Sequence, residues 1–181
     1  MTNYELNDNW TLWLHMPNDI DWSINSYKKV YKMDTLYKLI CINEKLDETI
    51  VTNCMLFIMK NNIKPIWEDE NNNKGGCFSY KIPNNLVYKV WKRLVYLLLG
   101  NTLCDAEILE NITGISISPK KSFCIIKLWL SNTEKVKEHI IYNFINSSIN
   151  NENIDIDPFN LSKLCNIDKQ ICIFKKHKLL Y

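Results

Sequence analysis

Glycine is scarce in this chain, and long apolar runs are missing from it. Only 4 of its 181 residues are glycine. No apolar stretch reaches the ~20 residues that a membrane-spanning helix needs. The first nine residues are polar and lack the apolar segment of a signal peptide. We therefore expect a cytoplasmic chain that does not enter a membrane.

An excess of charge of one sign is also missing. The 22 lysines and arginines balance the 20 acidic residues to a net charge of +2, and Arg93 is the sole arginine. So small a charge excludes general attraction to a nucleic-acid backbone, because that attraction depends on many basic groups. Any contact with nucleic acid should therefore be local. The abundance of Asn, Ile and Lys suggests an AT-rich genome.

The cysteines lack the spacing of a metal site or a disulfide framework. There are seven, an odd number, with no C-x-x-C pair, and Cys41 and Cys124 lie inside apolar runs. This pattern predicts buried free thiols in a reducing compartment rather than zinc ligands or disulfides. We expect no metal and no cofactor.

What the chain does contain is typical of one soluble globular domain. With 46% hydrophobic and 23% charged residues, residues 1–181 should form a single domain in which residues 1–9 are a flexible N-terminal segment. Alternating and helical apolar patterns predict an α+β fold, in which three main helices pack on the convex face of a curved antiparallel sheet and a ligand pocket lies on the concave side. The expected strands are residues 10–15, 27–32, 53–59, 77–82, 115–118, 123–130, 154–159 and 170–175. The expected helices begin after Asp34, at Pro83-Asn84-Asn85 (ending at Gly100) and at Ser131.

An aromatic residue followed by three carboxylates marks the loop from Lys64 to Phe78. Trp67 precedes Glu68-Asp69-Glu70, and Gly75-Gly76 ends the loop. In a turn, Trp67 and Glu68 can converge on one flat ligand, because an indole stacks and a carboxylate accepts two hydrogen bonds. Guanine carries two such donors on its pairing edge, and methylation of its imidazole ring makes it cationic. The alternative is an acidic surface turn with a half-buried Trp.

Two further tryptophans also lack a core explanation. Trp22 follows a turn in a polar loop without apolar periodicity. Trp129 shares a strand face with Lys127, whereas the opposite face is wholly apolar and should meet helices. Trp22, Trp67 and Trp129 are therefore candidates for a ligand surface.

The ordered set of these residues resembles the eukaryotic translation initiation factor 4E family of messenger-RNA 5′ cap-binding proteins. The resemblance runs from Trp10 to about Phe144 and weakens towards the C-terminus. It rests on Asn9-Trp10-Thr11-Leu12-Trp13, Asp21-Trp22, Met33-Asp34-Thr35, Lys64-Pro65-Ile66-Trp67-Glu68-Asp69-Glu70, Gly75-Gly76, Val90-Trp91 with Gly100, and Leu128-Trp129.

The resemblance implies a role for each matching residue. Trp22 and Trp67 would sandwich the 7-methylguanine of the cap, Glu68 would accept its two pairing-edge N–H groups, and Trp129 would touch the methyl group. The family holds the cap phosphates with an Arg and lysines. Ser118 falls at the position of that Arg, which leaves Lys120 and Lys121 as the available cations. The alternative for these lysines is a solvated charged turn.

The resemblance also implies a protein partner and no enzymatic activity. Relatives bind a helix of the scaffold factor 4G or of inhibitory proteins, at positions that correspond here to Ile40, Lys92, Arg93 and Tyr96. The family's exposed Trp and acidic residue are missing there, so the surface has either decayed or acquired a dedicated partner. We expect a monomer that acts in translation initiation; a cap-binding repressor and an adaptor without cap binding remain alternatives. An enzyme is disfavoured because His15, His139 and His177 are scattered and no nucleophile adjoins a base.

Overall fold

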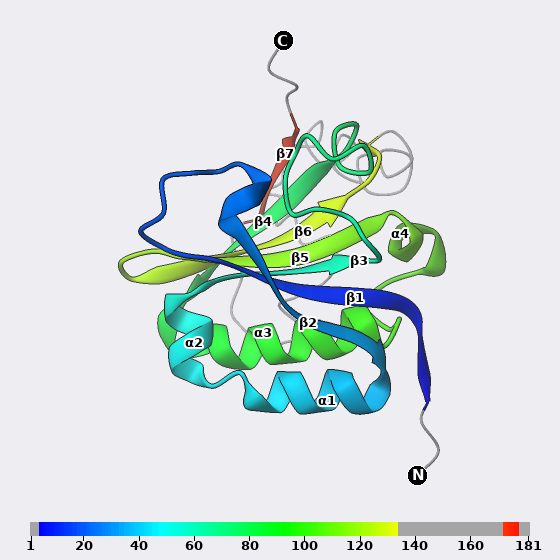
Figure 1. Cartoon of the computed structure of the whole chain (residues 1–181), viewed down its shortest axis with the longest axis horizontal. Helices are drawn as coiled ribbons and strands as arrows, with labels where there is room; N and C mark the ends of the chain where they lie inside the picture. Colours follow the sequence, from blue (N-terminus) through cyan, green and yellow to red (C-terminus); the bar gives the residue numbers. More distant parts are fainter. Residues whose placement is uncertain (1–3, 134–171, 178–181) are drawn as a thin grey trace, which may run out of the picture.

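One antiparallel sheet organises the described part of the chain, residues 4–133 and 172–177 of this computed structural model. Its seven strands run in the order β2-β1-β3-β5-β6-β4-β7 (Figure 1). The strands are β1 (Glu5–His15), β2 (Tyr27–Thr35), β3 (Met55–Lys60), β4 (Gly76–Pro83), β5 (Ile112–Pro119), β6 (Phe123–Leu130) and β7 (Cys172–Lys176). The predicted α+β fold with a curved antiparallel sheet in one domain is confirmed.

Three helices, α1 (Leu36–Lys45), α2 (Glu48–Asn53) and α3 (Asn84–Leu99), cover one face of the sheet (Figure 1). A short helix α4 (Ala106–Glu110) precedes β5, and a 3-10 turn η1 (Ile24–Ser26) precedes β2. Strand β3 shows how the pleat separates the faces, because Leu56 and Ile58 join the core beneath the helices while Phe57 and Met59 join a second cluster on the other face. Trp13 and Trp129 complete that second cluster.

The N-terminal residues correct one expectation. Residues 5–9 are not a flexible segment but the first part of β1, where Glu5 pairs with Thr35. Polar side chains there are compatible with a strand, since the backbone of Asn9 accepts a hydrogen bond from Asn61 N (2.5 Å) and Lys60 forms an ion pair with Asp8 (2.9 Å). The polar side chains suggested a flexible segment, but strand pairing depends on backbone hydrogen bonds, which side-chain composition does not report.

Helix boundaries also differ from expectation in places. The N-cap of α1 is Thr35 rather than Asp34, whose carboxylate pairs instead with Lys38 one turn along the helix. Helix α2 was not predicted, although Asp47 caps it by accepting a hydrogen bond from Ile50 N (2.8 Å). The helix expected from Ser131 and the strand expected over 154–159 lie outside the described residues.

The structure also bears on the predictions of buried free thiols and of a chain without a membrane span. The six cysteines described are all free thiols, and Cys77, Cys124 and Cys172 are buried. Cys41 is only partly buried, which corrects its expected place in the core. Among the described helices, none has both the length and the apolar character needed to cross a bilayer.

Candidate functional site

A cavity of about 590 Å³ opens on the sheet face opposite α1 and α3. Its walls come from the β1–β2 loop, β3, the β3–β4 loop, β5 and β6. All four residues expected to contact a base line it, together with one expected phosphate ligand: Trp22, Trp67, Glu68, Trp129 and Lys120. Lys121 is exposed and is not part of the lining, so the structure separates the two lysines that were grouped from the sequence.

Trp22 lies in a loop whose conformation is stabilised by hydrogen bonds between its neighbours Asp21 and Ser23. The Asp21 carboxylate accepts hydrogen bonds from Ser23 N (2.7 Å) and Ser23 Oγ (2.9 Å), and these bonds lower the pKa of Asp21. The indole of Trp22 is 56% exposed, yet the buried ring of His15 stacks on it with centroids 4.4 Å apart and planes 7° from parallel. One face of this indole is thus covered by protein.

The loop that carries Trp67 is organised by a buried side chain, Asn72. Its amide Nδ2 donates to Lys64 O and Ile66 O, each at 2.9 Å, and its Oδ1 accepts from Thr113 Oγ1 at 2.9 Å. The backbone carbonyl of Asn72 accepts from Gly75 N at 2.9 Å. These bonds tie both ends of the loop and β5 to one residue, which places Trp67 beside the cavity.

Two of the three carboxylates of this loop, Asp69 and Glu68, have different roles. Asp69 is structural, because it accepts hydrogen bonds from Lys64 N and Asn71 N, both at 3.0 Å, and these bonds lower its pKa against the effect of burial. Glu68 lines the cavity, and no hydrogen bond or ion pair to another described residue engages its carboxylate. Glu68 can therefore accept hydrogen bonds from a ligand.

Trp129 differs from the expectation of an open strand face. Only 3% of the residue is exposed, and its indole N–H donates to Ser116 Oγ at 2.9 Å. Phe57 packs against it edge-on, with ring centroids 6.4 Å apart. Trp129 therefore contributes a fixed, nearly buried edge to the cavity, whereas Lys127 two residues earlier on the same strand face supplies a cavity-lining cation.

The structure also brings in a residue that the sequence did not predict, His177. Its backbone N–H donates to Gly75 O (3.0 Å), and its Nδ1 lies 2.7 Å from Asn72 O, 105 residues earlier in the chain. The ring stacks on Trp67 at 12° with centroids 5.7 Å apart, and it packs against Trp129 at 5.2 Å. Pairing of β7 with β4 brings it here, a long-range contact for which the sequence carries no local signal.

The environment of His177 favours its neutral form. Burial lowers the pKa of its imidazole, and the positive charge of Lys127 acts in the same direction. The hydrogen bond to Asn72 and the negative charge of Glu68 raise the pKa, but they do not outweigh burial. The imidazole is thus uncharged at neutral pH.

The residues expected to bind a partner lie on the helical side, and two of them are engaged within the chain. Lys92 Nζ forms an ion pair with Glu44 (2.6 Å), and Tyr96 OH donates to the same carboxylate (2.7 Å). Both hydrogen bonds lower the pKa of Glu44. Ile40 and Arg93 are exposed. Arg93 forms no ion pair with another described residue, whereas Lys92 is not a free charge.

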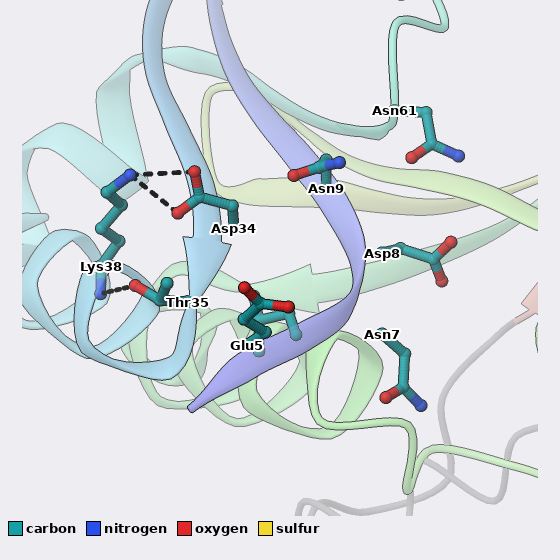
Figure 2. Close-up of a pocket in the computed structure, with 9 residues that line it drawn as sticks. Glu5, Asn7, Asp8, Asn9, Asp34, Thr35, Lys38 and Asn61 are labelled. Atoms are coloured by element: carbon teal, nitrogen blue, oxygen red, sulfur yellow. Dashed lines mark hydrogen bonds and ion pairs between the residues drawn. The ribbon is translucent and has the colours of Figure 1, made fainter. Parts of the chain in front are cut away.

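A second cavity, of about 550 Å³, lies where β1 passes the start of α1 (Figure 2). Its lining is polar, with Asp34 held by Lys38 and with Glu5, Asn7 and Asp8 along β1. None of the described residues that line it is aromatic, so they offer no stacking surface for a base. No cluster of His, Cys, Asp or Glu suited to a metal ion occurs in the described ranges.

Comparison with known proteins finds similarity to translation initiation factors. The model of the family described as eukaryotic initiation factor 4E matches residues 5–177. The eukaryotic translation initiation factor 4E homolog of Acanthamoeba polyphaga mimivirus is 28% identical over 140 residues, which cover 65% of this chain and 52% of that protein. The factor 4E of Saccharomyces cerevisiae is 25% identical over 139 residues, covering 73% and 64% of the two chains. The matches thus span between half and two thirds of these relatives.

Solved structures agree in fold over nearly the whole chain. Ascaris suum eIF4E-3, solved with an m7G cap, superposes with a TM-score of 0.74 at 20% identity, covering 98% of this chain and 93% of that one. Caenorhabditis elegans eIF4E-3, solved with the 4E-binding protein Mextli and a cap analog, gives a TM-score of 0.75 at 20% identity and covers 97% and 94%. The family comprises binding factors rather than enzymes. By its match over residues 5–177, this chain belongs to the eukaryotic initiation factor 4E family.

Proposed function

We propose that this chain binds the 7-methylguanosine 5′ cap of messenger RNA and acts with a protein partner in translation initiation in the cytoplasm. The observation that carries the proposal is the convergence of two loop tryptophans, Trp22 and Trp67, with Glu68 on one cavity. The relatives solved with cap ligands support it.

The methylated base would lie between the indoles of Trp22 and Trp67. Stacking contributes roughly 1–3 kcal/mol per base, and a cation over a desolvated aromatic face adds up to ~2 kcal/mol. Glu68 would accept the two pairing-edge N–H groups, and the fixed edge of Trp129 would contact the methyl group. Because the positive charge acts on both indoles and on the carboxylate, plain guanine would lose that contribution while it keeps the stacking and its hydrogen bonds to Glu68.

The cap phosphates would be held by lysines on the β5–β6 side of the cavity. Lys120 and Lys127 both line it. Lys121 is exposed on the same β5–β6 connection and is not part of the lining. A lysine is a point charge without the fork of arginine, so these contacts would give affinity that is sensitive to salt.

Titration of Trp fluorescence with nucleotides tests the site. We expect 7-methylguanosine triphosphate to bind about ten-fold to a thousand-fold more tightly than GTP, with each decade corresponding to 1.4 kcal/mol. The methylated monophosphate is the matched control for the lysines, and it should bind more weakly than the triphosphate, by a margin that narrows as salt is added. Equal affinity for the methylated and plain triphosphates would rule out the sandwich.

We also propose that the surface of α1 and α3 binds a partner helix. Ile40 and Arg93 are its exposed members, while Glu44 ties Lys92 and Tyr96 together at its centre. The complexes of C. elegans eIF4E-3 with Mextli support a protein partner of some kind. A helix with an apolar residue against Ile40 and an acidic residue against Arg93 would match this surface.

Reversal of the charge at position 93 tests the partner proposal. An ordinary factor 4G peptide should bind the wild-type chain poorly, and Arg93→Glu should improve its binding about two- to five-fold, roughly the effect of one exposed charge pair. Lys28→Glu, an equal charge change on exposed strand β2, is the control and should have no effect. Tight wild-type binding to the unmodified peptide in calorimetry would contradict the charge match.

A further inference from the structure

Each of the two stacking tryptophans is covered on one side by a histidine. His15 lies parallel to Trp22 at 4.4 Å between ring centroids, and His177 lies nearly parallel to Trp67 at 5.7 Å. Both histidines are buried, whereas Trp22 and Trp67 are exposed. We call His15 and His177 the rear histidines, because the cavity lining includes both indoles and neither imidazole. The free face of each indole is therefore the one available to a ligand.

The rear histidines share the same hydrogen-bonding pattern. One ring nitrogen of each lies against a backbone carbonyl: His15 Nε2 is 2.8 Å from Asp21 O, and His177 Nδ1 is 2.7 Å from Asn72 O. A carbonyl only accepts, so each of these nitrogens carries the proton of the neutral ring. The other nitrogens, His15 Nδ1 and His177 Nε2, are buried and have no hydrogen-bond partner in the described part of the chain. The bare Nε2 of His177 is a basic site that can take up a proton.

The charged and titratable groups around the rear histidines come from several elements. His177 is affected by Lys127 of β6 and Glu68 of the Trp67 loop. On its own strand, Lys175 lies 6.0 Å from the Trp67 ring. His15 faces Asp21, and it packs on Tyr27, whose burial raises the pKa of its phenol to about 12. Tyr27 therefore stays neutral in acid, and the carboxylates lie beside the rings rather than on the bare nitrogens.

We propose that the rear histidines are positioning residues for the cap base, and that protonation of the His177 ring behind Trp67 weakens binding of the methylated cap. The proposal rests on the sandwich proposed above. Neutral imidazoles hold the indoles without opposing a cationic base on the far face. An imidazolium would lie behind the indole and repel the cationic base through it.

The expected effect follows from the distances. With a base stacked on the free face of Trp67, an imidazolium at His177 and the methylated base would be roughly 9 Å apart, across one indole. At an effective dielectric of about 20–40, this repulsion corresponds to a loss of affinity of about five- to twenty-fold once His177 is fully protonated. Plain guanine has no charge to repel, so its affinity should change little. Acid should therefore reduce the preference for the methylated base.

The experiment measures the ratio of affinities for 7-methylguanosine triphosphate and GTP by Trp fluorescence between pH 6.5 and pH 5. The two nucleotides carry the same triphosphate, so phosphate protonation cancels in the ratio. In this range the methylated base keeps its own pairing-edge proton. The variants are His15→Phe, which keeps a ring behind Trp22 but loses the hydrogen bond to Asp21 O, and His177→Gln, which keeps a donor for Asn72 O but takes up no proton. Circular dichroism at each pH confirms that every variant is folded.

The wild-type ratio should fall as the pH is lowered across this range, and His177→Gln should show a constant ratio. A wild-type ratio that stays constant would overturn the proposal, even if neither variant folds. An equal fall in His177→Gln would overturn it as well. Failure of the sandwich itself would look different, because the wild type would then show no preference for the methylated nucleotide at pH 6.5.

Discussion

Replacing Trp67 by alanine should lower affinity for the methylated cap nucleotide by about 2–4 kcal/mol, or roughly 30- to 700-fold. The variant loses one stacking surface and the cation–π attraction that this surface provides. It also opens the space between the base and His177, since the indole is what separates them. Trp22→Ala should have an effect of the same order, because Trp22 offers the second surface.

A fluorescence titration of Trp67→Ala, Trp67→Phe and Tyr37→Ala separates stacking from a general loss of an exposed aromatic ring. Trp67→Phe keeps a smaller ring and should lose less affinity than the alanine variant. Tyr37 is 64% exposed on α1, on the opposite side of the sheet from the cavity, so its removal should leave affinity unchanged. If Trp67→Ala bound within two-fold of the wild type, the base would have to stack elsewhere.

Replacing Asn72 by alanine should destabilise the fold by about 2–4 kcal/mol and reduce cap affinity together with it. The substitution leaves Lys64 O, Ile66 O and the Thr113 hydroxyl without their partner, and an unsatisfied buried polar group costs about 1–3 kcal/mol. Not all of these costs add, because water can reach Lys64, which is exposed. The loss of affinity follows because the Trp67 loop is no longer held.

Denaturant unfolding of Asn72→Ala and of its neighbour Asn71→Ala provides a matched comparison. Asn71 is exposed, and its side chain bonds only to Asp69 Oδ1 (3.0 Å) among the described residues. The Asn71→Ala substitution should lower the free energy of unfolding by less than about 1 kcal/mol, as surface substitutions do. Similar unfolding midpoints for the two variants would show that Asn72 does not organise the loop.

The fold was largely predictable because its signals are local. Alternation in β6 indicated which face meets the helices, and the apolar stripe of α3 together with Gly100 gave its extent. Helix α2 was missed because six residues carry too little periodicity to be distinguished from a loop. The start of β1 was missed because its pairing is made by backbone groups, which composition does not report.

The site was predictable only where side-chain type alone indicated a ligand. Trp22, Trp67 and Glu68 stood out since no core pattern explained them, and the structure brings them to one cavity. Asn72 and His177 did not stand out, because an asparagine in a polar loop and a histidine after a strand have nothing unusual in their neighbours. Their importance comes from contacts across the sheet that only the folded chain makes.

The hydrogen bond between His177 and Asn72 also sets the order in which the site can be completed during synthesis. The two residues are 105 positions apart, so a ribosome has added most of the domain before His177 can meet the Trp67 loop. Until then Trp67 lacks the ring on which it stacks, and Gly75 lacks the partner of its carbonyl. A nascent chain halted before β7 should therefore have most of its sheet and an unfinished site. Such a chain should bind its ligand more weakly than the finished protein while it is still attached to the ribosome.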